Sequence, residues 1–211
     1  VITDNSLTDI TPQAMTTNPT EDFSITIGDT EVTVVDAGIS NVTVFDTIYL
    51  NTPISVGGII LSGLYQITTI VGTTSYKIIS ANAATATETN GGTGPVFDTT
   101  SGNSSVEVTL PDHGQAVGNT VVFSATTTAG GVVIFGSYTV ATIIDADTFT
   151  IVTNTQATSS VTVPMNSGNA QIVYYIALGP AALGSGYGTG AYGAGGYGTG
   201  ETSSVQTGTP I

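Results

Sequence analysis

The sequence predicts an all-β protein of two tandem small antiparallel β-barrel or sandwich modules, with an extended N-terminal arm and a Gly-rich C-terminal tract. Three observations lead to this prediction. Residues 56–65 (VGGIILSGLY) correspond to residues 129–138 (AGGVVIFGSY), 73 positions later. Runs of β-branched residues are separated by turn signals at the short, even intervals of small β-sandwiches and barrels. The helix formers Lys, Arg, Glu, Gln and Leu are scarce, whereas Thr, Val, Ile and Gly are abundant.

The correspondence continues on both sides of these segments. Downstream, Tyr76 corresponds to Phe149 at the same offset of 73 residues. Upstream, residues 32–34 correspond to 106–108 at an offset of 74 residues, so a one-residue insertion lies between the two blocks. A repeat of this length is typical of modular scaffolds, because a catalytic constellation is rarely needed twice in tandem.

The chain is expected to divide at the changes in composition. Residues 1–24 are polar, contain Pro12 and Pro19, and are expected to form an extended arm with at most a short strand. The expected divisions are an arm at 1–24, β module 1 at 25–100, β module 2 at 101–178, and a Gly/Tyr-rich tract with linker at 179–211.

Alternating and β-branched residues predict the strands within each module. In the first module we expect strands at residues 23–27, 32–35, 42–50, 59–61, 65–70 and 75–79, and a closing loop at 90–94. In the second module we expect strands at residues 105–110, 119–125, 131–134, 137–144, 147–153, 159–163 and 169–177. Residues 81–87 could supply one helical turn at most.

The segment 179–200 contains three five-residue units, GYGTG, AYGAG and GYGTG, with Tyr187, Tyr192 and Tyr197 in register. A period of five matches neither a helix nor a strand, so the three tyrosines cannot share one face of either element. One interpretation is a flexible linker. The other is an ordered loop whose tyrosines pack on a partner or on a neighbouring copy, since tyrosine offers a large contact area at low entropic cost. These tyrosines are the candidate contact residues.

The charge balance excludes several classes of partner. Lys77 is the only basic residue against fifteen carboxylates, and the formal net charge is −14. Counterion release at DNA requires several Lys or Arg residues, and anionic membranes also attract basic segments. We therefore expect no specific nucleic-acid binding, although an acidic surface could line a channel that DNA passes through. No apolar run is long enough for a membrane-spanning helix, and cysteine is absent.

Two short segments carry the residues most often used in catalysis or metal binding. Asp112-His113 lies in a Pro-x-x-Gly turn and contains the only histidine, and no G-x-S-x-G nucleophile motif accompanies it. Asp145-Ala146-Asp147 lacks the further ligands of a calcium loop and is expected to be a β-turn. Neither segment recurs in the first repeat. We therefore predict no catalytic, cofactor-binding or metal-binding residues, and no enzymatic activity.

The second repeat resembles a β module of tail and virion proteins from tailed bacteriophages. The resemblance rests on Pro111, His113-Gly114, Val117 to Asn119, Val121 to Phe123, Gly130-Gly131, Gly136, Tyr138 and Asp145 to Thr150. The pattern is similar to the small β-barrel identified as the first catalytic-cysteine half-domain of ubiquitin-activating enzymes. That activity does not carry over, because this chain contains no cysteine. The Gly-Tyr tract resembles one found in podophage-type tail hub or nozzle proteins.

Together the repeat, the charge and the resemblance predict a non-enzymatic structural protein of a bacteriophage virion. It is expected in the tail, as a hub, nozzle or fibre component of the extracellular particle, forming a homo-oligomer with copies of itself and with other virion proteins. One alternative is a module that binds carbohydrate or a host receptor through exposed tyrosines. Another is a repeat of a bacterial extracellular adhesin.

Overall fold

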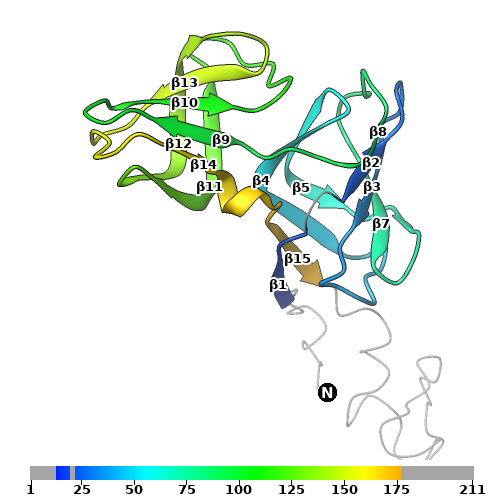
Figure 1. Cartoon of the computed structure of the whole chain (residues 1–211). Coiled ribbons are helices and arrows are strands. Elements are labelled where there is room, and N and C mark those ends of the chain that lie inside the picture. The colour runs from blue at the N-terminus through cyan, green and yellow to red at the C-terminus, as the bar shows by residue number, and fades with distance from the viewer. Residues whose placement is uncertain (1–12, 20–21, 177–211) are drawn as a thin grey trace, which may run out of the picture. The chain divides into compact units, whose positions relative to one another are not determined.

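The computed structural model describes residues 13–19 and 22–176, and strands make up most of the described chain (Figure 1). Nearly all of these residues belong to one compact unit, Ala14–Tyr175. The predicted all-β fold is confirmed. Within the described residues the only helical segment is a short 3-10 turn at Met165–Gly168, and none of the described helical structure is long and apolar enough to cross a membrane.

The first repeat supplies a five-stranded sheet in the order β6-β7-β3-β2-β8. Adjacent strands are antiparallel, as in the pairing of Val34 with Tyr76. One face of β3 and β7 is buried because Val32, Val34, Tyr76 and Ile78 alternate with more exposed residues. The strand bounds are β2 Phe23–Ile25, β3 Glu31–Val35, β6 Thr69–Ile70, β7 Ser75–Ile79 and β8 Glu88–Gly91.

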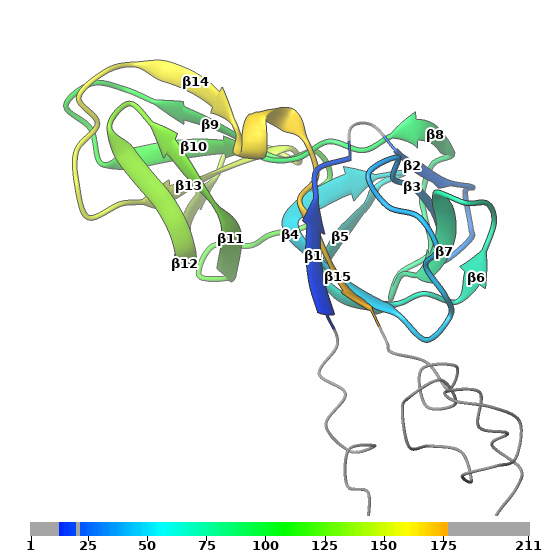
Figure 2. The same cartoon turned by 90° about the horizontal axis from the view of Figure 1, so that it is seen from below.

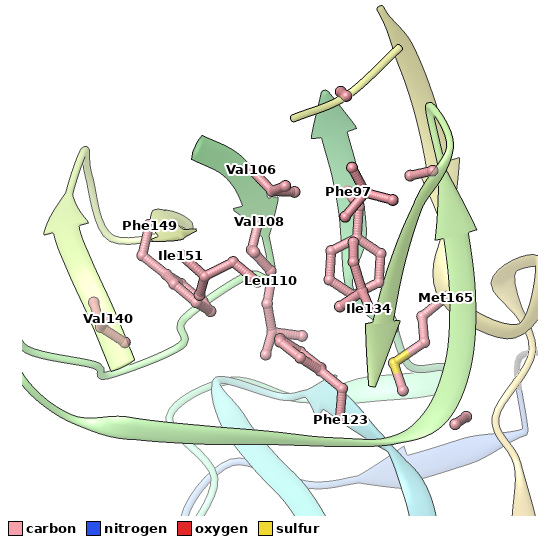
Figure 3. Packing of buried hydrophobic residues seen from close by; sticks show 14 residues of the cluster. Phe97, Val106, Val108, Leu110, Phe123, Ile134, Val140, Phe149, Ile151 and Met165 are labelled. Atoms are coloured by element: carbon pink, nitrogen blue, oxygen red, sulfur yellow. The ribbon is translucent and has the colours of Figure 1, made fainter. Parts of the chain in front are cut away.

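The second repeat forms a six-stranded sheet in the order β11-β12-β13-β10-β9-β14. Its inward side chains make a continuous apolar core in which the rings of Phe97 and Phe123 meet edge to face (Figure 3). The strand bounds are β9 Val96–Thr99, β10 Ser105–Thr109, β11 Thr120–Ala129, β12 Val132–Ile143, β13 Thr148–Val152 and β14 Val161–Pro164.

A third sheet, in the order β1-β15-β4-β5, joins segments that lie far apart in the sequence (Figure 2). Strand β15, which we expected among the strands of the second repeat, pairs antiparallel with β4 of the first, with Tyr174 opposite Ile48. The short strand β1 is the one allowed for in the N-terminal arm. The strand bounds are β1 Gln13–Thr17, β4 Thr47–Val56, β5 Ile59–Gln66 and β15 Ile172–Ile176.

The two hairpins β4–β5 and β11–β12 share the same irregularity at an offset of 73 residues. The register of the first shifts between Leu50 and Ile54, and that of the second shifts between Phe123 and Thr127. Each hairpin turns on two glycines with positive φ, and a third glycine with positive φ lies opposite the start of the bulge. The φ angles correspond closely, at 56° and 55°, 77° and 81°, and 86° and 91°, for the pairs Gly57 and Gly130, Gly58 and Gly131, and Gly63 and Gly136.

Loop hydrogen bonds recur at the same spacing. The backbone N–H of Thr85 donates to the carbonyl of Gly57, and that of Thr158 donates to the carbonyl of Gly130. The internal repeat is therefore a repeat of backbone geometry as well as of sequence. Further equivalent donor–acceptor pairs are Gly28 to Ala84 with Gly102 to Ala157, Ala84 to Asp29 with Ala157 to Asn103, Ser80 to Thr30 with Thr153 to Ser104, and Asp36 to Thr74 with Leu110 to Asp147. The module boundaries at residues 100 and 178 stay a prediction.

Several strand bounds differ from those expected. We expected breaks at Gly63 and Gly136, but β5 and β12 run through these glycines without interruption. A glycine in a strand permits the local twist of a bulge without ending the ladder. Strand β4 also begins later and ends later than expected, at Thr47 and Val56. Strands β8 and β9 were not expected: the polar sequence ETNG of β8 carries little β-propensity, and the short sequence VFDT of β9 follows the Gly-rich segment 91–94.

The hairpin glycines supply a test of this geometry. At Gly130 a Cβ atom would lie 2.4 Å from the carbonyl oxygen of Ser159, whereas at Gly136 it would meet no atom within 4 Å. Both residues have positive φ, so Gly136→Ala is expected to cost about 1–2 kcal/mol of backbone strain. Gly130→Ala adds a steric clash with rigid backbone and should cost about 2–5 kcal/mol in total. Chemical denaturation of both variants measures the difference, and equal losses would contradict the packing described for the turn.

Candidate functional site

The Asp112-His113 pair is part of a turn in which both imidazole nitrogens are engaged. The backbone N–H of Gln115 donates to Nδ1 of His113 at 2.8 Å, and Nε2 lies 3.2 Å from the carbonyl oxygen of Asp145. Because Nδ1 accepts, Nε2 carries the proton that bonds the carbonyl. The ring is only 4 % exposed and meets Phe149 edge to face at 5.0 Å. A histidine held in this way positions the loop and has no free nitrogen for proton transfer.

The Asp145-Ala146-Asp147 segment likewise closes turns with its carboxylates. Asp145 Oδ1 accepts from the backbone N–H of Asp147, and Asp147 Oδ1 accepts from the backbone N–H of Asp112, both at 2.9 Å. Asp112 itself has a positive φ of 51°. These bonds support the turn interpretation of the segment. Within the residues that the structure describes, no group of three or more His, Cys, Asp or Glu side chains is arranged to hold a metal ion.

The candidate contact residues Tyr187, Tyr192 and Tyr197 lie outside the described residues 13–19 and 22–176. Within the described part of the chain, two strand edges occupy equivalent positions in the repeat: the outer edge of β4 in the first repeat and the outer edge of β11 in the second. Each edge lies on the side of its strand that faces away from the hairpin partner, β5 or β12.

The β4 edge is occupied by β15. Ile172 lies opposite Leu50, and the backbone N–H of Asn51 donates to the carbonyl of Gln171 at 2.9 Å. In an antiparallel ladder this bond makes Leu50 and Ile172 a non-hydrogen-bonded pair, so Tyr49 and Thr47 direct their N–H and C=O groups towards β15.

Tyr174 secures this pairing from the buried face of β15. Its hydroxyl donates to Asp36 Oδ2 at 3.0 Å and lies 2.6 Å from the hydroxyl of Tyr76. The two rings meet edge to face with centroids 5.9 Å apart. Asp36 is also buried and accepts hydrogen bonds from Thr17 Oγ1 and the backbone N–H of Gly38. A carboxylate with three donors is well compensated for its burial.

Burial raises the pKa of both hydroxyls. For Tyr76 the loss of solvent is the largest cause, and the hydrogen bond to Tyr174 opposes it in part. For Tyr174 the loss of solvent is again the largest cause, and the neighbouring Tyr76 and Asp36 raise the pKa of its hydroxyl further. Both side chains therefore stay neutral at pH values where an exposed tyrosine ionises.

The equivalent edge of β11 differs in sequence and in occupancy. Leu110 takes the place of Asp36, and Phe149 takes the place of Tyr76, so the polar partners of a tyrosine hydroxyl are missing. Within the described residues β11 pairs with β12 alone, and β4 contacts β11 without pairing with it. A cavity of about 220 Å³ lies beside this edge. It is lined by Leu110, Gln115, the segment 120–123 and Phe149, with Pro53, Ile60 and Ser62 of the β4–β5 hairpin.

The outer face of the β11–β12 hairpin exposes three large apolar side chains along its length. Val122 is 50 % exposed, Val133 58 % and Phe135 57 %. Ile60 of the first repeat corresponds to Val133, and it is partly buried because it packs against the core of the second repeat. Val133, which corresponds to Ile60, is thus exposed at a position that the first hairpin uses for packing.

The sequence alone did not identify these edges, because an edge is defined by which strands pair with each other. The alternating pattern of β15 predicts a strand but not its partner, and Asp36 resembles any polar turn residue. One signal was present in the repeat, namely the replacement of Tyr76 by Phe149. No protein-family model matches the chain, and a comparison with curated proteins finds no match either.

The buried hydroxyl of Tyr174 gives a direct test of the closed edge. Tyr174→Phe would leave Asp36 and Tyr76 each without one hydrogen-bond partner, at an expected cost of about 1–3 kcal/mol in the free energy of unfolding. Tyr138→Phe is the matched control, because the Tyr138 hydroxyl accepts from the backbone N–H of Phe135 at a more exposed position. Urea denaturation compares the two variants, and equal losses would contradict the role assigned to Tyr174.

The raised pKa values of Tyr76 and Tyr174 predict a loss of stability in alkaline solution. Below a pH of about 10 both residues are neutral in the folded and unfolded states, so their contribution is constant. Above that pH the unfolded chain releases protons that the folded chain retains, and the free energy of unfolding falls by up to about 1.4 kcal/mol per pH unit for each tyrosine. The fall should be shallower in Tyr174→Phe. Parallel curves for the two proteins would contradict the assignment.

Proposed function

We propose that this chain is a non-enzymatic structural component of a bacteriophage virion, a tail hub, nozzle or fibre protein that assembles as a homo-oligomer. The observation that carries the proposal is the recurrence of backbone geometry without recurrence of chemistry. The bulges, glycine turns and loop hydrogen bonds repeat at 73–74 residues. His113 and Asp145, by contrast, have no equivalent in the first repeat and serve as local turn residues.

The surface of the second repeat supports an assembling protein. Val122, Val133 and Phe135 expose apolar side chains on the outer face of the β11–β12 hairpin, and β11 is the edge strand of its sheet in the described part of the chain. An open strand edge favours pairing with another chain, and soluble monomers generally protect such edges with charge, proline or a covering segment. No residue of Thr120–Phe123 is charged or proline. The exposed apolar side chains of this hairpin therefore suit permanent subunit packing.

The resemblance of the second repeat to tail and virion modules supports the phage context. Of the residues that carry it, Pro111, His113 and Gly131 lie in turns and loops, whereas Val121 to Phe123 and Tyr138 lie in strands β11 and β12. They specify a shape, and a virion protein is selected for shape and contact. The net charge of −14 is compatible with a particle whose interior passes DNA, because an acidic wall does not bind phosphates.

The proposal is tested by the composition of the particle. Virions encoded by the genome that carries this sequence are purified by density gradient, and their proteins are quantified by mass spectrometry against a protein known in copy number. We expect the chain in several copies per particle, at a constant ratio across the gradient peak. An abundant cytoplasmic host protein, measured in the same fractions, serves as the control for contamination. A chain that is produced during infection but absent from particles would contradict the proposal.

A further inference from the structure

The first and last strands of the described chain bond the same buried carboxylate. Thr17 of β1 and Tyr174 of β15 both donate a hydroxyl hydrogen to Oδ2 of Asp36, which is 1 % exposed. Hydrogen bonds are strongest where water is excluded. When one strand leaves, water reaches the carboxylate and competes with the hydroxyl that remains. Each strand therefore strengthens the bond that the other makes to Asp36.

A glycine beside the carboxylate makes room for β1. The backbone N–H of Gly38 donates to Oδ1 of Asp36. A Cβ atom at position 38 would lie 3.3 Å from Cβ of Thr17 and 3.1 Å from Oδ1 of Asp36, so a side chain there would displace one of them. The close approach of Thr17 thus depends on the same loop that holds the carboxylate.

The N-terminal arm also bonds the segment that leads into β15. Strand β1 is the neighbour of β15 in the third sheet (Figure 2). Beyond β1, the carbonyl of the buried Pro19 accepts from the backbone N–H of Ala170, and Oδ1 of Asn18 accepts from Nδ2 of Asn166. These two bonds join segments at opposite ends of the described chain. The arm and the β15 segment therefore hold each other as well as the first repeat.

The turn before β15 opposes this docking. Asn166, Ser167 and Gly168 have consecutive positive φ angles of 48°, 58° and 90°. The left-handed region is unfavourable for residues with a Cβ atom, and more so for serine than for asparagine. A turn that is no longer held by the docked segments can return to ordinary angles. Release of β15 would therefore relieve strain, which offsets part of the stabilisation from Asp36.

We propose that residues 14–19 and 166–175 form a strap that docks on the first repeat and leaves it as one unit, coupled through the Asp36 carboxylate. The strap has two states. In the docked state of the structure, β15 covers the β4 edge and Asp36 is buried. In the released state, both strands are free and the strained turn has relaxed. This equilibrium is a property of the fold and is independent of the proposed function.

The strap connects the two ends of the described chain. From β1 the chain continues to residue 12, and from β15 it continues to residue 177. A ligand shifts a conformational equilibrium by its preference for one state. A partner that binds either strand only when it is free would therefore release the other strand too, and would uncover the backbone groups of Thr47 and Tyr49 that now bond β15.

Native-state hydrogen exchange of the full chain measures the release of each segment. The amide of Asn51, which bonds the carbonyl of Gln171, reports on β15, and the amide of Ala170, which bonds the carbonyl of Pro19, reports on the arm. Amides that open in one cooperative event share one protection factor. We expect the two values to agree within about threefold. The proposal is overturned if the Ala170 amide is at least about tenfold less protected, because the arm then leaves while β15 stays docked.

A substitution on β1 tests the coupling directly. Thr17→Val removes the hydroxyl that bonds Asp36 and keeps the β-branched shape. If the strap is one unit, the protection of the Asn51 amide and of the Ala170 amide should fall together, each by about tenfold. Thr16→Val, the same change at the exposed neighbouring position, is the matched control and should leave both values unchanged. A fall at Ala170 alone overturns the proposal, and circular dichroism establishes that each variant is folded.

Glycine substitutions test the strained turn. Glycine adopts the φ of 58° at position 167 without strain, so Ser167→Gly should raise the protection of both amides by about threefold. Asn169→Gly is the matched control in the same segment. Its φ is −91°, so glycine there only adds freedom to the released chain and should lower the protection. A fall in both variants would contradict the role assigned to the turn.

Discussion

The pairing of β15 with the outer edge of β4 is the contact on which the rest of the structure depends. It brings residues 172–176 back to a strand that begins at Thr47 and so returns the chain to the first repeat. The buried hydroxyl of Tyr174 secures it through Asp36 and Tyr76. Because Asp36 also binds Thr17 of β1, one carboxylate connects both terminal strands to the first repeat.

The second repeat has the same edge without this contact. The backbone has the same bulge and the same glycine angles, yet Leu110 and Phe149 replace the polar pair. The two nearly identical hairpins are thus completed differently: β4 pairs with β15, whereas among the described residues β11 pairs with β12 alone.

The residues that usually indicate chemistry act here on the backbone. His113 accepts and donates within a single turn, and Asp145 and Asp147 bind amides of neighbouring residues. Each side chain lets its loop depart from regular structure while the polar groups of the loop stay bonded. The exposed side chains of Val122, Val133 and Phe135 have no such local role, and they support the proposal of an assembling protein.

The sequence by itself determined the all-β class, the 73-residue repeat and the strands β3, β7, β10 and β13, because alternation and glycine turns are local signals. It also identified Asp112-His113 and Asp145 to Asp147 as turns. Only the tertiary structure decided that β5 and β12 run through Gly63 and Gly136, and that β15 pairs with β4. Pairing depends on which distant edge offers a complementary surface. The β4 and β11 edges have the same sequence periodicity, but only the β4 edge has Asp36 to accept the buried hydroxyl of Tyr174.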